Sequence, residues 1–541
     1  MNSKMRTLPR LGSALERSRW TMALTMMAGL AAIVHFSLPL VITYDTAHYH
    51  LYLPILSGLE PLSAWDRARQ PGYPLFLWAV RHLLGGSQHA FLLVHFVLLI
   101  SIVGQSLSFV WRRHRQAWPR LLAIALLTFF ILLDPLVVGY YHVLLTECVA
   151  ATIAVTSCFR AVLWVSWTTS SARANARFWS ELLFWCILVV FSYHLKQSYL
   201  FCALIPFFVA TIISFFSRKE TSSRLLQTGA VAAVLASLGA SISLWNYILP
   251  ENKDPHMLTR EPSAIGAKFL VAGLARAEEI GSVDSLLNIE RAAEITAELK
   301  SLVESTAADP SLRPTCTLVY RLGAGPDAPF EILPCKGNAP SLGEAVTFLL
   351  RSLLRAPGAV LAGYGEGLLR MTRILPSGVA LGGGKYNVMK ESEAIGYMPY
   401  RGLSNVFWMP EELSRGIEGY RQHDVLKARG GLGLLPWKWF RGHVLYLFST
   451  VLLLLVAAFP FALWACGRAL RETKPLDETL VFVTAASATT LALFGFHVAL
   501  GVVIDRYSLP AYLLGLTASC LVLVKISDFG RDASKGKEAG V

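Results

Sequence analysis

Ten apolar stretches recur along this chain, and they constrain its fold more than any other feature. Each is about 20 residues long, which as a helix is enough to cross the hydrocarbon core of a bilayer. Of the 541 residues, 54% are hydrophobic and 16% are charged, whereas soluble proteins have charged residues nearer a quarter. We therefore predict an all-α polytopic membrane protein with about ten spans. They cover residues 20–43, 88–110, 121–139, 143–165, 179–197, 198–216, 225–247, 443–468, 478–503 and 508–526.

The segments on one side of these spans are rich in lysine and arginine, and this bias predicts the orientation of the protein in the membrane. By alternation, six basic segments share that side: the N-terminus and residues 111–120, 171–178, 217–224, 467–474 and 525–537. Because basic loops stay in the cytoplasm, both termini are expected there. The net charge of +13 is then a topology signal and an attraction to anionic lipids, not a nucleic-acid footprint.

The spans divide the chain into two membrane modules and one large external segment. Residues 1–247 hold seven spans and a first external loop, 44–87, and residues 442–541 hold the last three spans and a cytoplasmic tail. Between them, residues 248–441 have mixed charge and turn signals and are numerous enough for a small extracytoplasmic domain of mixed structure.

Cysteine positions fit this division. Cys316 and Cys335 lie in the external segment, where an oxidising compartment permits a disulfide that would stabilise by about 3 kcal/mol. Two free thiols are the alternative. The other six act as small apolar residues within spans: Cys148, Cys158, Cys186, Cys202, Cys466 and Cys520.

Ionisable and aromatic polar residues gather at the predicted outer ends of the spans. Charged groups near hydrocarbon are expensive, so a set from distant parts of the chain on one side predicts a site at the outer membrane boundary. Such a site suits a lipid substrate that enters sideways. Lys196 and Arg506 are suited to bind a phosphate, and Asp45 is suited to act as a general base. The set is Asp45, Arg67, Arg69, Tyr73, Glu147, His194, Lys196, Asp505, Arg506 and Tyr507.

Simpler interpretations stay open for several of these residues. Asp45 is also compatible with the polar end of a helix, and Glu147 with a structural ion pair to Lys196. His48 and His50 are more typical of interfacial residues than of metal ligands, and His194 is equally compatible with packing. Asp134, which precedes Pro135, is typical of the end of a span.

The order of these features resembles a known family. It is similar to that of the GT-C class of integral-membrane glycosyltransferases. Five features carry the similarity: an Asp after the first span, an Arg-x-Pro-Gly-Tyr-Pro stretch leading into a helix, a Thr-Glu at the outer start of the fourth span, a basic residue ending the fifth, and an Arg-Tyr before the last. The bacterial enzymes that use polyprenyl-phosphate-linked sugars are most similar. Residues 20–247 and, in outline, 443–526 share the resemblance, whereas 250–441 match nothing. Here these features are Tyr44-Asp45 with Tyr49, Arg69 to Pro74, Thr146-Glu147, Lys196, and Arg506-Tyr507 with Pro510.

The resemblance implies a reaction and roles for these residues. A sugar would pass from a polyprenyl-phosphate donor to an envelope glycan, lipid or protein on the extracytoplasmic face of the bacterial cytoplasmic membrane. Asp45 would accept the proton of the attacking hydroxyl, and a single displacement would invert the anomeric centre. Lys196, Arg506 and Arg69 would stabilise the departing phosphate. Tyr73, Glu147, His194 and Tyr507 would complete the donor site.

The resemblance leaves metal use and function class partly open. Position 46 is Thr where many members of the class have a second acid, so a divalent metal such as Mg²⁺ or Mn²⁺ stays an open question. A polysaccharide polymerase or ligase would depend more on arginines between 250 and 441. A transporter or flippase would show internal repeats and charges or broken helices at mid-membrane depth. A non-catalytic assembly protein would use the external segment for docking.

Asp45 yields the first prediction. The substitution Asp45→Asn removes the proposed base while keeping its shape, so we expect normal folding and membrane insertion and no sugar transfer. Insertion is measured by yield and monodispersity in detergent, and transfer with a labelled polyprenyl-phosphate sugar. Full activity in this variant would remove Asp45 from the catalytic role.

Overall fold

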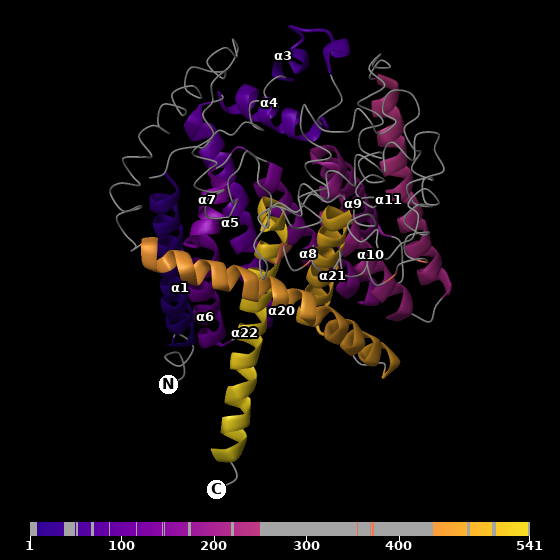
Figure 1. The fold of residues 1–541 in the computed structure, drawn as a ribbon. Helices are drawn as coiled ribbons and strands as arrows, with labels where there is room; N and C mark the ends of the chain where they lie inside the picture. The colour runs from indigo at the N-terminus through magenta and orange to yellow at the C-terminus, as the bar shows by residue number, and fades with distance from the viewer. Residues whose placement is uncertain are drawn as a thin grey trace.

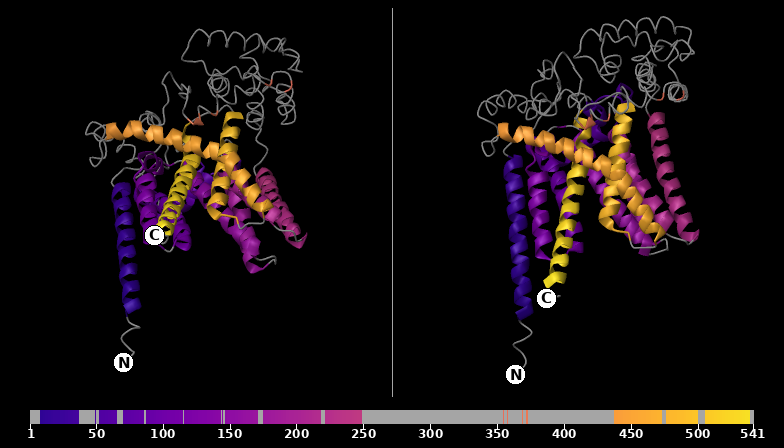
Figure 2. Two further views of the ribbon diagram at one scale, coloured as in Figure 1. Left: turned by 90° about the horizontal axis from the view of Figure 1, so that it is seen from below. Right: turned by 60° about the horizontal axis from the view of Figure 1, so that its bottom comes forward.

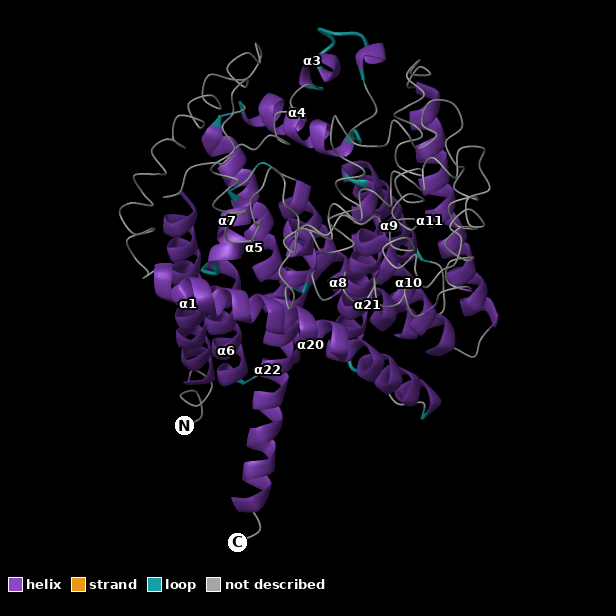
Figure 3. Cartoon of the chain, in the orientation of Figure 1, coloured by secondary structure: helices purple, strands orange, loops and turns teal. Residues whose placement is uncertain are grey.

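The computed structural model describes residues 8–36, 49, 52–65, 70–85, 87–114, 116–142, 144, 146–170, 175–217, 221–248, 354, 357, 368, 371–372, 437–472, 476–499 and 505–538. Within these ranges all regular structure is helical (Figure 3). The expected mixed domain and its cysteines, Cys316 and Cys335, lie outside the described residues. The elements in chain order (Figure 1) are α1 (Leu8–Phe36), α3 (Leu53–Leu56), η2 (Leu62–Ala64), α4 (Gly72–Leu84), α5 (Gln88–Arg113), α6 (Ala117–Leu127), η3 (Thr128–Leu132), α7 (Pro135–Tyr141), α8 (Thr146–Ser170), α9 (Ala176–Leu195), η4 (Gln197–Tyr199), α10 (Leu200–Ser217), α11 (Thr221–Ile248), α20 (Trp437–Arg471), α21 (Glu478–Ala499), η9 (Asp505–Ser508) and α22 (Leu509–Glu538).

Eight of the described helices are long and apolar enough to cross a membrane, and they coincide with eight of the ten predicted spans. The other two predictions, 20–43 and 121–139, fall on shorter apolar helices, Met22–Phe36 and Ala117–Leu132. The protein is therefore a multi-pass helical membrane protein. Helix α1 begins and α22 ends at the same end of the bundle, whereas α3 and α4 lie at the opposite end (Figure 1).

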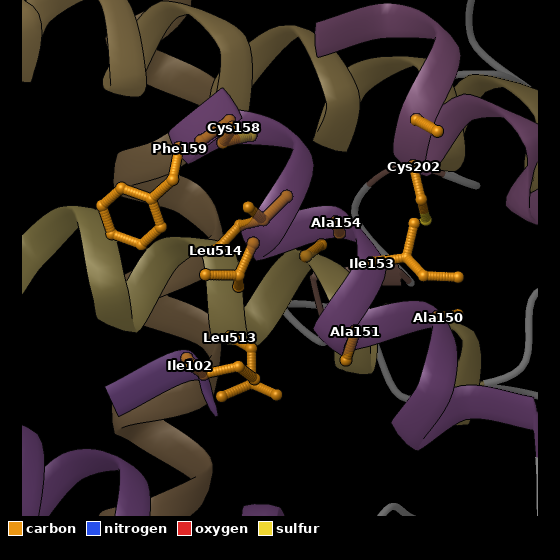
Figure 4. Close-up of a cluster of buried hydrophobic side chains, with 14 of the residues drawn as sticks. Ile102, Ala150, Ala151, Ile153, Ala154, Cys158, Phe159, Cys202, Leu513 and Leu514 are labelled. Carbon is orange, nitrogen blue, oxygen red and sulfur yellow. The ribbon is translucent and has the colours of Figure 1, made fainter. Parts of the chain in front are cut away.

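Helix α8 is the centre of the bundle. In the most apolar part of α8, 83% of the residues are buried inside the protein, whereas the corresponding share for α11 is 22%. Small residues line α8, among them Ala150, Ala154 and Cys158, and they let α5, α10, α21 and α22 pack closely around it. Figure 4 shows this packing, with Cys202 of α10 and Leu513 of α22 beside α8. Cysteines in the spans thus serve as small packing residues, as predicted.

Two helices lie at the edge of the bundle. Helix α11 packs mainly on α9 and α10 and keeps an apolar outer face. Helix α20 runs obliquely over α21 and α22 (Figure 2), and side chains such as Phe461 and Trp464 point away from the core. Exposed apolar side chains on such edge helices suit contact with lipid.

The third predicted span is not one continuous helix. Helix α6 passes into a π-helical turn, η3, and α7 begins afresh at Pro135. Asp134, 2% exposed, caps the new helix: its Oδ1 accepts the Val137 N–H at 3.0 Å, and its Oδ2 accepts the Tyr512 hydroxyl of α22 at 2.7 Å. Asp134 therefore marks a helix end, as predicted, and also fastens the break to the last span.

An equivalent cap lies at the other end of the bundle, in a half-buried setting. Asp477 precedes α21 and accepts the Leu480 N–H at 3.1 Å and the Lys525 ammonium at 2.7 Å. Burial acts to raise the pKa of Asp477, but the hydrogen bonds and the charges of Lys525 and Arg113 bring it below its usual value. Nearby, Arg113 of α5 binds Glu478 at 2.7 Å, so this end joins α5, α21 and α22.

The two caps give a matched test of what burial adds. Asp134→Ala removes the cap of α7 and leaves the buried Tyr512 hydroxyl without an acceptor, so we expect the free energy of unfolding to fall by about 2–4 kcal/mol. Asp477→Ala removes a cap with the same geometry where water can substitute, and about 1–2 kcal/mol should be lost. Unfolding in mixed detergent micelles, followed by circular dichroism, measures both. Equal losses would contradict the structural role of Asp134.

Candidate functional site

Helix α4 begins directly against the end of α9. A Cβ on Gly72 would lie 2.6 Å from the backbone C and O of His194 and from the Leu195 N. Only glycine permits such an approach of two backbones. The Pro-Gly-Tyr stretch of the first external loop is thereby held against the stretch His194–Lys196, although more than a hundred residues separate them in the chain.

Tyr73, the next residue, is completely buried. Its ring packs on Tyr49 at 4.8 Å and on Phe76 at 5.6 Å between centroids. Its hydroxyl has no hydrogen-bond partner among the described residues. Burial, with added effects of Cys148, Tyr49 and Glu147, raises the pKa of Tyr73 well above its usual value, so the phenol is neutral. A buried phenol that lacks a partner is available to hydrogen-bond a ligand.

Glu147 lies near this phenol, in the first turn of α8. It is 2% exposed, and Oε2 accepts the Thr146 hydroxyl at 3.2 Å. Its position in the first turn of α8 sets it beside backbone N–H groups that have no partner within the helix. The following residue, Cys148, places Sγ 3.6 Å from the His95 Nε2. Predicted residues of the first loop and of the fourth span thus do lie together.

Lys196 and Tyr507 form a second part of the site. Lys196 is in extended conformation between α9 and η4, and its Nζ lies 3.6 Å from the centre of the Tyr507 ring and 5.6 Å from that of Tyr199. His497, in the last turn of α21, stacks on Tyr507, with the ring centroids 4.5 Å apart and the ring planes at 13° to each other. We call Lys196, Tyr507 and His497 the cation stack. The ammonium is held by aromatic faces, and the alternative of a Glu147–Lys196 ion pair is not seen among the described residues.

On the other side of the same stretch, an apolar groove of about 560 Å³ lies between α4, α9 and α11. His194, at 9% exposure, is the main polar side chain within it. Its Nε2 is 2.7 Å from the Ser241 Oγ, and its Nδ1 has no hydrogen-bond partner in the part of the chain that the structure describes. The groove is large enough for part of a long hydrocarbon chain. Its lining is Pro71, Gly72, Leu75, Cys186, Ile187, Val190, Phe191, His194, Ser237, Ser241, Leu244, Trp245 and Ile248.

The first external loop also closes over this region. Trp65 stacks on Tyr52 at 4.3 Å and meets Trp245 of α11 edge-on at 5.2 Å. Trp245 in turn lies 6.1 Å from the His194 ring. The groove is therefore apolar along the helices and has an imidazole, a hydroxyl and indoles near its loop end, a distribution that suits a lipid.

Other predicted residues fall outside this account. Asp45, Arg67 and Arg69 lie outside the described residues, and of Arg506 the structure describes only the backbone, in η9 beside Tyr507. Among the described residues, no three of His, Cys, Asp and Glu converge as a metal site would require. The open question of a divalent metal therefore gains no ligand set from these residues.

Some residues of the site were not predicted from the sequence. Ser241 and Trp245 lie one helical turn apart in the apolar α11, and that spacing places them on one face. A hydroxyl and an indole side chain on one face of a span are the pattern from which this part of the site could have been predicted. His497 gave a similar signal, because it ends an apolar helix a few residues before Arg506 and Tyr507.

Comparisons with protein-family models, with curated proteins and with solved structures found no match for this chain.

The close approach at Gly72 is directly testable. Gly72→Ala puts a methyl group into the α9 backbone, so α4 must move away from His194, and we expect a loss of 2 kcal/mol or more, on the order of an overpacked core. Gly239→Ala on α11 is the control, since a Cβ there meets nothing within 4 Å. Thermal unfolding of both variants in one detergent measures the difference. If Gly72→Ala unfolds like the parent protein, α4 does not pack as described.

Proposed function

We propose that the protein is a GT-C-type membrane glycosyltransferase that moves a sugar from a polyprenyl-phosphate donor to an acceptor of the cell envelope. The reaction takes place on the extracytoplasmic face of a bacterial cytoplasmic membrane, inverts the anomeric centre and uses Asp45 as general base. The sugar and the acceptor are left unassigned.

One observation carries this proposal. Four stretches that the resemblance selects meet at one end of the bundle, although no two of them adjoin in sequence. Gly72 packs on the His194–Leu195 backbone, Tyr73 lies near Glu147, and Lys196 lies over Tyr507. Convergence of groups from distant segments on one place is what a shared substrate requires.

The groove and the cation stack suit different parts of the donor, namely its hydrocarbon chain and its phosphate head group. The groove is apolar and offers space to hydrocarbon. Lys196 follows His194 by two residues and lies over the Tyr507 ring of η9, and we propose that the phosphate attached to the chain lies there. In the transferase, Lys196 and Arg506 bind that phosphate and stabilise the charge that builds up on it as the bond to the sugar breaks.

Chain length limits how far the proposed base can lie from this site. Tyr49 packs on Tyr73, and Asp45 precedes Tyr49 by four residues, which span at most about 14 Å when fully extended. The hydroxyl of the acceptor would give its proton to the Asp45 carboxylate while its oxygen attacks the anomeric carbon. Polyprenyl phosphate leaves with the electron pair of the broken bond.

A transporter is the second candidate, because one observation favours it. The break between α6 and α7 places a buried carboxylate, Asp134, within a predicted span. Broken helices with buried charges are common at transport sites. The carboxylate is, however, already occupied by the Val137 N–H and the Tyr512 hydroxyl, which supports a structural role.

Reconstitution with a radiolabelled polyprenyl-phosphate hexose distinguishes these candidates. Transfer of the label to a lipid or glycan acceptor is the expected result. Label that crosses the bilayer unchanged would indicate a transporter, growth of a polymer would indicate a polymerase, and no change in any assay would remove all three. An Asp66→Asn variant is the matched control for Asp45→Asn, because it removes a carboxylate from the same external loop.

The cation stack gives the quantitative arm of this experiment. Lys196→Met keeps the length of the side chain but removes its charge, and we expect kcat/KM to fall about 100-fold, as when one stabilising donor is lost. Lys525→Met, at the opposite end of the bundle, is the control and should stay within about twofold. Equal activity of the two variants would remove Lys196 from the donor site.

A further inference from the structure

His142 follows α7, and its two ring nitrogens face the carbonyl ends of two helices. Its Nδ1 lies 2.6 Å from the Val138 carbonyl oxygen in the last turn of α7, and its Nε2 lies 2.6 Å from the His35 carbonyl oxygen in the last turn of α1. The side chain is 2% exposed. The last carbonyls of a helix have no partner within the helix, and next to a side chain this buried, water has little access to them.

The helix end on the α1 side is also where the first external loop begins. His35 is the penultimate residue of α1, and Asp45 follows ten residues later in the chain. The bond from His142 to the His35 carbonyl therefore acts where the chain leaves the membrane toward the proposed base. The bond to Val138, by contrast, completes α7 alone.

Two more imidazoles surround this contact. The ring of His35 lies 4.2 Å from that of His142 and its Nε2 is 2.9 Å from the Leu92 carbonyl oxygen of α5. His95 of α5 contacts the Tyr141 carbonyl oxygen at 2.8 Å. Each of these imidazoles contacts a single backbone carbonyl, whereas His142 contacts two, and it alone among the three contacts carbonyls of both α1 and α7.

The double contact has a chemical requirement. A neutral imidazole has one N–H, so donation to both carbonyls at the same time needs the imidazolium form. The negative ends of two helix dipoles favour that charge, and burial opposes it. In either protonation state, the two nitrogens face two different helices. A substitution that keeps only one donor position therefore tests the two contacts separately.

We propose that His142 is a positioning residue, which ties the end of α1 to α7 and thereby fixes where the first external loop leaves the membrane. Its effect on catalysis rests on the proposed function, since it acts through Asp45. Its effect on the end of α1 does not.

Two amide variants separate the two bonds. An Asn amide nitrogen takes the place of Nδ1, so His142→Asn keeps the bond to Val138 and loses the bond to His35. A Gln amide nitrogen takes the place of Nε2, so His142→Gln keeps the bond to His35 and loses the bond to Val138. His95→Asn controls for general disturbance among the buried histidines.

Hydrogen exchange of the full chain in detergent, read by mass spectrometry, tests the joint without any assay of activity. One lost hydrogen bond corresponds to about fivefold faster exchange. We expect His142→Asn to accelerate exchange in the last turn of α1 and to spare α7, and His142→Gln to do the opposite. Unchanged exchange at α1 in His142→Asn, or equal acceleration in both variants, would overturn the proposal.

Steady-state transfer of labelled sugar supplies the second readout. We expect His142→Asn to lower kcat about tenfold or more with little change in KM, because a displaced base slows the chemical step and not donor binding. His142→Gln should keep most of kcat, and loss in Gln with retention in Asn would contradict positioning through α1. If the parent protein transfers no sugar, the proposed function fails, and the exchange experiment still decides the role of His142.

Discussion

Hydrocarbon offers no hydrogen bonds to a peptide group, and this constraint accounts for much of the polar chemistry within the bundle. The break between α6 and α7 creates helix ends that are buried within the bundle. Asp134 caps the start of α7, and His142 and His95 contact carbonyls at its end. These buried side chains therefore have a structural explanation. Tyr73 and His194 differ from them, because each keeps an atom with no hydrogen-bond partner among the described residues.

The candidate site is organised around one short stretch of chain. Residues 194–196 end α9, and their two sides face different surroundings. His194 faces an apolar groove beside α11, whereas Lys196 faces aromatic rings from η4 and η9. A lipid phosphate has the same division into an apolar chain and an anionic head. The chemistry of the stretch therefore matches that of the proposed donor at both ends.

Hydropathy predicted most of the fold because length and apolarity decide which segments can cross a bilayer. The grouping of Tyr73, Glu147, Lys196 and Tyr507 was also predictable, since alternating spans return to the same side. Side-chain partners were not. In lipid, both faces of a span are apolar, so a sequence does not show how each helix is rotated. That Lys196 would meet Tyr507 instead of Glu147, and that Gly72 would touch the α9 backbone, depends on those rotations.

The contact at Gly72 has a mechanical consequence. Where two backbones touch with no side chain between them, neither can shift by a rotamer change, so a displacement of α4 must be transmitted to the chain at His194. The start of α4 and the end of α9 then move together. A lipid that wedges into the groove between α4, α9 and α11 would therefore displace α4 and the chain at His194 together and leave the spacing between them unchanged.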